Sequence, residues 1–110
     1  SIVGRDKDLI ITGGLNVYPR EVESLVDEVD GVQESAVIGV PHPDFGEAVV
    51  AIVAAAPGTV SADAVIEALA GKLAKFKQPK SVHLVDALPR NSMGKVQKAA
   101  LRDEYAGLFA

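Results

Sequence analysis

The sequence contains no cysteine, no tryptophan and only two histidines among its 110 residues. Without cysteine there is no disulfide framework, and His42 and His83 are too few and too far apart to predict a zinc site, so we expect no bound metal. The longest apolar run, Ala48 to Pro57, is about half of what a membrane-spanning helix needs. No basic segment precedes an apolar one at the N-terminus. We therefore predict no membrane contact and a reducing, cytoplasmic setting.

Aromatic residues are also scarce, at 5%, whereas 48% of residues are hydrophobic and 24% are charged. This balance is typical of a globular protein, and the length predicts one domain, 1–110, with a core of its own. The chain begins with Ser1, and its first motif starts at Gly4. We expect a domain from a longer protein, although processing of a small free-standing protein would give the same start.

Basic residues are few in the first part of the chain. Residues 1–67 hold three basic and twelve acidic side chains, whereas residues 68–110 hold eight basic and three acidic ones, within a net charge of −4. The second part is therefore suited to face anions. Lys72 and Lys75 are expected only to keep a helix face soluble. With few aromatics and no recognised motif, nucleic acid ranks well below a nucleotide or coenzyme.

Proline and glycine divide the chain into short elements. In chain order we expect strands at 8–12 and 15–18, a helix from Pro19 to Gly31, strands at 32–40 and 48–55, a helix from Ser61 through Phe76, a strand at 82–85 and a helix from Lys95 through Tyr105. The run 48–55 is apolar at every position, so this strand should be covered on both faces and pair antiparallel with its predecessor. The order predicts an α+β sandwich: a small three-stranded sheet, mixed or antiparallel, plus an N-terminal two-stranded hairpin, packed with about three helices.

Some local signals are sharper. Gly13 and Gly14 have the composition of a tight two-residue hairpin turn, and Ser61 is a natural N-cap. Glu21 and Glu23 are expected to support structure at a helix start. One helical stripe should be buried; its members are Val65, Ile66, Leu69, Leu73 and Phe76.

Residues 89–98 read PRNSMGKVQK. Here we expect Lys95 at the start of the last helix, where the helix dipole disfavours a cation, so that Lys95 is better explained by an external anion. The Gly-Lys pair is not a nucleotide-binding P-loop, because Pro89 replaces the first glycine and Val96 replaces the magnesium-binding hydroxyl.

This segment resembles the C-terminal lysine motif of adenylate-forming enzymes, which include acyl-CoA synthetases, at Pro89, Arg90, Gly94 and Lys95. Residues 4–23 are similar to the hinge and glycine-loop motif of the same family, and residues 39–47 are a weaker third match. The resemblance thus spans almost the whole chain. Residues 75–105 look most like malonyl- or methylmalonyl-CoA synthetases.

The resemblance implies roles for several residues. Lys95 would be the catalytic lysine that contacts the acyl carboxylate and the α-phosphate. Lys7, in a hinge segment 1–7, would let the domain turn between the two half-reactions. Gly13 and Gly14 would line the path of the pantetheine arm, and cofactor contacts would include Arg5 and Lys98. Asn16 departs from members that carry a phosphate-binding arginine there, so no phosphate role is expected for it.

The resemblance also implies ligands and partners. ATP, coenzyme A and Mg²⁺ would be bound mainly by an N-terminal domain of the same enzyme, which would also hold the small carboxylic acid. A lysine acetyltransferase acting on Lys95 would silence the enzyme by deleting its charge. Coenzyme A or a carrier protein remain alternative acceptors. The alternative function is a free-standing α+β module that uses its basic half to bind a nucleotide or an acidic partner.

Overall fold

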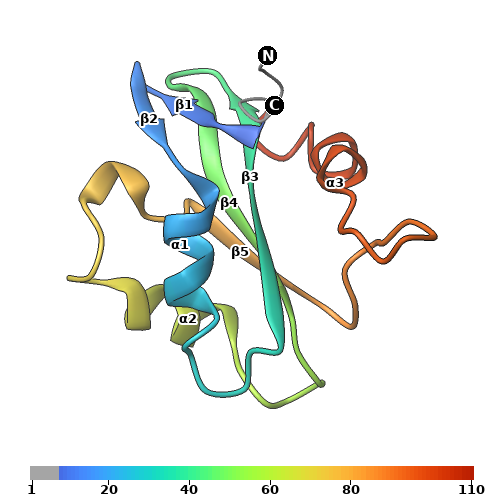
Figure 1. The fold of residues 1–110 in the computed structure, drawn as a ribbon. Helices are drawn as coiled ribbons and strands as arrows, with labels where there is room; N and C mark the ends of the chain where they lie inside the picture. Colours follow the sequence, from blue (N-terminus) through green and yellow to red (C-terminus); the bar gives the residue numbers. More distant parts are fainter. Residues whose placement is uncertain (1–7) are drawn as a thin grey trace.

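The computed structural model describes residues 8–110, so the predictions for Arg5, Lys7 and the hinge segment 1–7 lie outside the described residues. The elements, labelled in Figure 1, are β1 (Ile10–Thr12), β2 (Leu15–Val17), α1 (Pro19–Val26), β3 (Glu34–His42), β4 (Gly46–Ala54), α2 (Ala62–Leu69), the 3₁₀ helix η2 (Lys75–Lys77), β5 (Ser81–Val85) and α3 (Lys98–Glu104). This confirms the predicted α+β class. None of these helices is long and apolar enough to cross a bilayer.

Strand β4 is the centre of the sheet. It pairs antiparallel with β3 along its full length, from Glu34 opposite Ala54 to His42 opposite Gly46. Its other edge pairs parallel with β5, so the sheet is mixed. The β1–β2 hairpin joins the same sheet through a single pair, Thr12 with Gly46.

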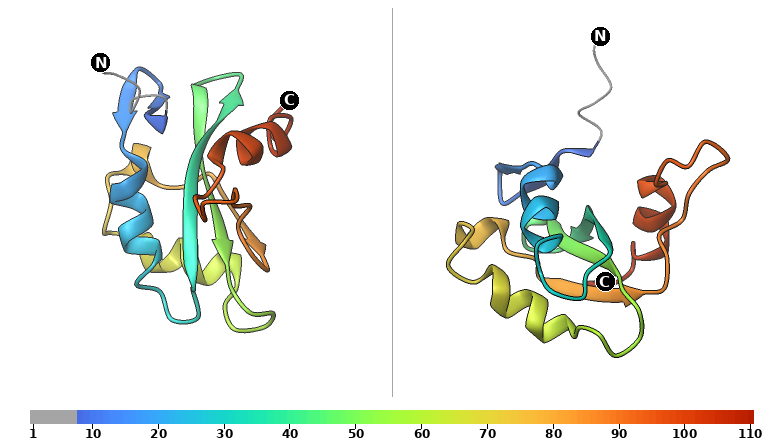
Figure 2. Two further views of the ribbon diagram at one scale, coloured as in Figure 1. Left: turned by 45° about the vertical axis from the view of Figure 1, so that its right-hand side comes forward. Right: turned by 60° about the horizontal axis from the view of Figure 1, so that its bottom comes forward.

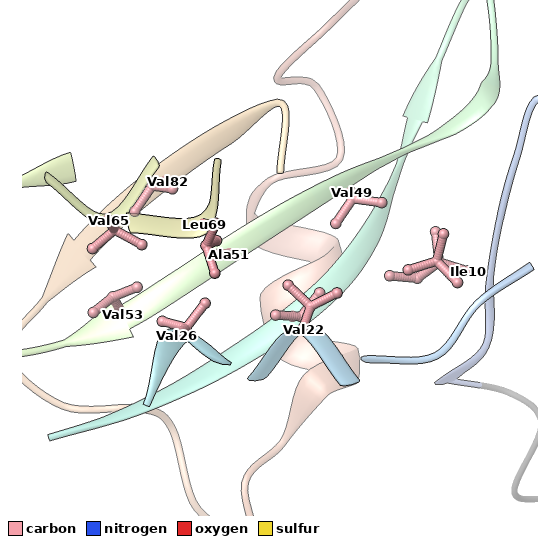
Figure 3. Packing of buried hydrophobic residues seen from close by; sticks show 11 residues of the cluster. Ile10, Val22, Val26, Val49, Ala51, Val53, Val65, Leu69 and Val82 are labelled. Carbon is pink, nitrogen blue, oxygen red and sulfur yellow. The ribbon is translucent and has the colours of Figure 1, made fainter. Parts of the chain in front are cut away.

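The sheet has a hydrophobic core on each face, as the apolar run 48–55 predicted. Val49, Ala51 and Val53 point toward α1 and α2, where they pack with Val22, Leu69 and the other side chains in Figure 3. The alternate residues of β3 and β4 pack on the other face against Leu88 and Leu101. Figure 2 shows the same division, with α1 and α2 on one side of the sheet and α3 on the other.

Local signals explain where several elements begin. Pro19 is the first residue of α1, a position that suits its fixed φ. The Ser61 hydroxyl accepts a hydrogen bond from the Ala64 amide at 3.1 Å, which confirms the predicted cap. Gly13 and Gly14 have φ of 56° and 81°, the left-handed pair that a two-residue hairpin needs.

Three predictions about element length were wrong. Helix α1 ends at Val26, five residues before the expected end at Gly31, and the chain continues in turns. The β3–β4 pairing continues through Pro41 and His42, where a loop was expected; β3 is an edge strand, which tolerates proline. Helix α2 ends at Leu69, and the chain then bends at Gly71, whose φ is 82°. The expected buried stripe is therefore interrupted, and Ile66 and Phe76 remain 38% and 37% exposed.

Candidate active site around Lys95

Lys95 lies in a narrow turn between β5 and α3, here called the lysine loop (residues 90–96). An isolated bridge pairs Arg90 with Val96 at its base. Inside it, the Asn91 amide donates to the Lys95 carbonyl at 3.0 Å, and the Gly94 amide donates to the Asn91 carbonyl at 2.9 Å. Gly94 has φ of 82°, which glycine adopts without strain. The loop is thus a hydrogen-bonded hairpin that projects from the sheet beside α3 (Figure 1).

The predicted place of Lys95 at a helix start was wrong. Helix α3 begins at Lys98, with Gln97 as its N-cap, so Lys95 lies outside its first turn. The influence of a helix dipole is confined to the terminal turn, and α3 has only seven residues. The helix end therefore does not explain this lysine, and its environment has to be read from the loop and the groove.

Lys95 lines an open groove of about 560 Å³. The lining is charged; it includes Asp8, Arg20, Glu23, Asn91, Lys95, Lys98 and Arg102. Both carboxylates are already matched, because Lys98 Nζ lies 2.7 Å from Glu23 Oε2 and Arg102 Nη1 lies 3.1 Å from Asp8 Oδ1. Within residues 8–110, Lys95 and Arg20 have no ion-pair partner, so the groove keeps a positive field that favours an anion.

Glu23 holds the floor of the groove together. Its Oε2 accepts a hydrogen bond from the Val37 amide of β3 at 2.8 Å as well as the Lys98 ammonium. Only 11% of the Glu23 side chain and 18% of the Lys98 side chain are exposed. The structural role predicted for Glu23 is supported by these contacts. A phosphate contact by Lys98 would require this ion pair to open.

Two residues of this site have contacts that the sequence did not predict, although Arg90 belongs to the lysine motif. The Arg90 guanidinium donates from Nη1 to the Gly94 carbonyl at 2.7 Å and pairs through Nη2 with Glu34 of β3, so Arg90 fastens the lysine loop to the sheet. Asn91 accepts hydrogen bonds on Oδ1 from the amides of Met93 and Lys95. For Asn91, the one indication in the sequence was the residue type, because asparagine is favoured in such turns.

The glycine hairpin lies on the opposite side of the molecule from the lysine loop, as Figures 1 and 2 both show. The Gly13 amide donates to the Phe45 carbonyl at 2.8 Å, and the Ile11 amide donates to Glu47 Oε1 at 2.9 Å, so the β3–β4 turn supports the hairpin. Beside Gly13 is a second groove of about 220 Å³, which is also lined by Phe45, Phe76, Lys75 and Lys80. The two predicted sites are therefore separate.

The remaining chemistry of the described residues is limited. Within residues 8–110, no three His, Cys, Asp or Glu side chains come together as a metal site would require. We therefore assign none of these residues to Mg²⁺. Burial, and then the charge of Glu104, raise the pKa of Tyr105 above its ordinary value. The Tyr105 ring packs against that of His83, and Tyr105 is given no role.

Comparison with known proteins gives a consistent family. Residues 21–95 match the AMP-binding enzyme C-terminal domain. The chain is 53% identical over 104 residues to a 3-[(3aS,4S,7aS)-7a-methyl-1,5-dioxo-octahydro-1H-inden-4-yl]propanoyl:CoA ligase of Rhodococcus jostii, covering 94% of this chain and 20% of the ligase. It is 47% identical over 105 residues to the long-chain-fatty-acid–CoA ligase FadD13 of Mycobacterium tuberculosis, covering 96% of this chain and 21% of that protein.

Solved structures agree with this result. Apo MatB from Rhodopseudomonas palustris superposes with a TM-score of 0.92 and 58% identity, covering 97% of this chain and 22% of MatB. A Mycobacterium tuberculosis fatty acyl CoA synthetase gives a TM-score of 0.87 and 46% identity over 93% of this chain and 20% of that one. The chain therefore spans about a fifth of the length of its relatives. It belongs to the family of AMP-binding enzyme C-terminal domains, as the motifs at both ends predicted.

Proposed function

We propose that residues 1–110 form the C-terminal domain of an ATP-dependent acyl-CoA ligase, which converts a carboxylic acid first to an acyl-adenylate and then to a CoA thioester. The observation that carries this proposal is the Lys95 ammonium, presented by a hydrogen-bonded turn in a groove whose carboxylates are already paired. The acid pocket and most ATP contacts belong to the missing N-terminal domain. This chain alone should therefore have little or no activity.

Lys95 serves the first half-reaction. There, a carboxylate oxygen attacks the α-phosphorus of ATP and pyrophosphate leaves, so two anions must approach while charge grows on the phosphoryl oxygens. A compact ammonium with three rotatable donors can contact both anions and reduce their repulsion. Loss of one well-placed electrostatic donor typically costs about 10²- to 10³-fold in rate. Acetylation of the exposed Lys95 by an acetyltransferase would remove this charge and remains a prediction.

The glycine hairpin serves the second half-reaction. Because Gly13 and Gly14 carry no side chain, a thin pantetheine arm can pass close to their backbone. Rotation about Lys7 would bring this hairpin to the acyl group in place of Lys95, and Arg5 is proposed as a further cofactor contact. The location of the two sites on opposite sides of the fold supports a reorientation between the steps.

The groove beside the hairpin is our candidate for the coenzyme A phosphates. Arg90 and Lys98 are each engaged by a carboxylate within the domain. Lys80 instead lies over the Phe45 ring, 4.6 Å from its centroid, and lines the groove with Lys75. Among the basic residues of the C-terminal half, we therefore assign Lys80 to the coenzyme A phosphates. For Lys98 we propose a structural role.

The acid is proposed to be malonate or a related short dicarboxylate. The resemblance of residues 75–105 to malonyl- and methylmalonyl-CoA synthetases and the 58% identity to MatB support this choice. The 53% identity to the ligase of a bulky propanoic acid and the 47% identity to FadD13 favour larger acids as the second candidate. The groove at Lys95 does not distinguish short dicarboxylates from larger acids, because every acid would present a carboxylate group to this lysine.

The test is to supply the full-length protein that contains this chain with ATP, Mg²⁺, coenzyme A and one acid at a time. The panel should include malonate, methylmalonate, a long-chain fatty acid and a ring-bearing propanoic acid. We expect CoA thioester and AMP to form, with malonate or methylmalonate giving the highest kcat/KM. A preference for a larger acid would contradict the substrate proposal alone. No thioester from any acid would contradict the ligase proposal itself.

A further inference from the structure

Asn91 makes two hydrogen bonds to the backbone of Lys95. Its backbone amide donates to the Lys95 carbonyl at 3.0 Å, and its side-chain Oδ1 accepts from the Lys95 amide, also at 3.0 Å. Asn91 therefore contacts both polar backbone groups of Lys95, and the Lys95 carbonyl also accepts a hydrogen bond from Gln97 Nε2 at 3.0 Å. Within the described residues no other side chain makes a hydrogen bond to the Lys95 amide.

The orientation of the Asn91 carboxamide is dictated by its partners. Oδ1 accepts a second hydrogen bond, from the Met93 amide at 2.9 Å. Two backbone N–H groups converge on one atom, and only the carbonyl end of the carboxamide can accept both. The side chain thus bridges the two strands of the lysine loop from inside, and it also lines the groove into which Lys95 faces.

The rest of the loop is fastened differently. Arg90 holds the Gly94 carbonyl and Glu34, so it attaches the loop to β3 without touching Lys95. The tip is exposed, with 88% of Met93 accessible, so packing does not restrain it. Without the Asn91 acceptor, the Lys95 amide would lose its side-chain partner, and only the two hydrogen bonds to the Lys95 carbonyl, from the Asn91 amide and Gln97 Nε2, would still hold the backbone at this residue. A displacement of about 1 Å at a reacting group can cost as much as 10²-fold in rate.

We infer that Asn91 is a positioning residue for adenylation: its side-chain carbonyl fixes the backbone of Lys95 and so sets the direction in which the ammonium leaves the lysine loop. This inference rests on the proposed function of Lys95. Asn91 itself need not touch substrate, because its Oδ1 is already used by two amides. The requirement is for an acceptor at this position, and the carboxamide nitrogen is not needed.

The test uses the full-length enzyme with two substitutions of similar shape. Asn91→Leu removes the acceptor and keeps the branching, whereas Asn91→Asp keeps an oxygen that the two amides can still reach. Acyl-adenylate formation is measured by pyrophosphate release without coenzyme A, and thioester formation is measured separately from supplied acyl-adenylate. Lys95→Ala is measured in parallel, and the melting temperature of each variant is recorded.

We expect Asn91→Leu to lower kcat for adenylation roughly 10- to 100-fold at an unchanged KM for ATP, with thioester formation and melting temperature preserved. Asn91→Asp should recover most of the lost rate. If Asn91→Leu adenylates normally while Lys95→Ala does not, the role of Asn91 is refuted and that of Lys95 stands. Equal loss in Leu and Asp variants, or equal loss of both half-reactions, would also refute it. Normal adenylation by Lys95→Ala would refute the proposed function and this inference together.

Discussion

At the scale of single residues, lysines of the C-terminal half differ in what their ammonium groups meet. Lys77 Nζ lies 2.9 Å from Glu21 Oε1 in an exposed ion pair. Lys98 Nζ lies 2.7 Å from Glu23 Oε2 in an ion pair that is less exposed to solvent. Lys95 has no such partner within residues 8–110 and faces the groove. A paired ammonium must give up one anion to bind another, so an unpaired one is better suited to a substrate that comes and goes.

The Glu23–Lys98 pair should contribute much more to stability than a surface pair does. Glu23→Ala leaves the Lys98 ammonium and the Val37 amide without their acceptor in a nearly buried place, so we expect the free energy of unfolding to fall by about 2 to 4 kcal/mol. Glu23→Gln keeps an acceptor for Val37 and should lose less. Urea denaturation of the 110-residue chain measures both. If the free energy of unfolding of each variant lies within about 0.5 kcal/mol of the parent value, the ion pair does not stabilise the domain.

These partnerships mark the limit of sequence analysis at the residue scale. Lys95 was predictable because its neighbours form a motif. A structural role for Glu23 was predicted from a helix start, but Glu23 is the fifth residue of α1, and only Glu21 lies in the first turn. The pairing of Glu23 with Lys98, and of Arg90 with Glu34, joins segments that are far apart in the sequence and meet only after β3 has formed an edge of the sheet. Local patterns carry no information on such contacts, so the ion pair of Lys98 was not predicted, and its predicted cofactor contact stays a prediction.

At the scale of elements, the glycine hairpin is lightly attached. One sheet pair, Thr12 with Gly46, and two further hydrogen bonds join it to the β3–β4 turn. Its inner residues Ile10 and Val17 are fully buried, whereas Ile11 and Leu15 are 49% and 50% exposed. The hairpin is therefore packed on one face and leaves apolar side chains exposed on the other.

Substitutions at Gly14 separate backbone strain from loss of space. A Cβ at Gly14 would meet nothing within 4 Å inside the domain, but φ of 81° strains any L-residue other than Asn or Asp. Gly14→Ala should cost about 1 kcal/mol of stability and Gly14→Asn less. Both should slow thioester formation and spare adenylation, because either side chain occupies the proposed pantetheine path.

Stability by urea denaturation and the two half-reactions of the full-length protein check this expectation. If thioester formation follows stability, so that the Ala variant is impaired and the Asn variant is normal, then strain and not a blocked path explains the glycine. Normal thioester formation in both variants would remove the hairpin from the mechanism.

Element prediction succeeded where the signal is local. The Ser61 cap, the Gly13–Gly14 turn and the doubly buried β4 all follow from neighbouring residues. The start of α3 was misplaced because the Arg90–Val96 bridge competes with the helix for the same residues. The parallel pairing of β5 was left open between mixed and antiparallel, since the apolar pattern of a short strand does not reveal its direction.

At the scale of the whole molecule, the two proposed sites lie on different sides of the domain, although the groove at Lys95 also reaches Arg20 and Glu23 of α1. The face with α1 and α2 carries the glycine hairpin, and the face with α3 carries the lysine loop (Figure 2). A rigid domain with its two functional groups on opposite sides can present only one of them to a single cleft. The proposed alternation between half-reactions would then require rotation of the domain and no change in its interior.

The most direct measurement is the rate of each half-reaction in the full-length protein carrying Lys95→Ala, with the exposed Lys72→Ala as a control that changes the same charge elsewhere. The account predicts that Lys95→Ala slows acyl-adenylate formation about 10²- to 10³-fold while supplied acyl-adenylate is still converted to thioester, and that Lys72→Ala alters neither rate. Equal loss of both half-reactions in Lys95→Ala, or adenylation at the parental rate, would contradict it.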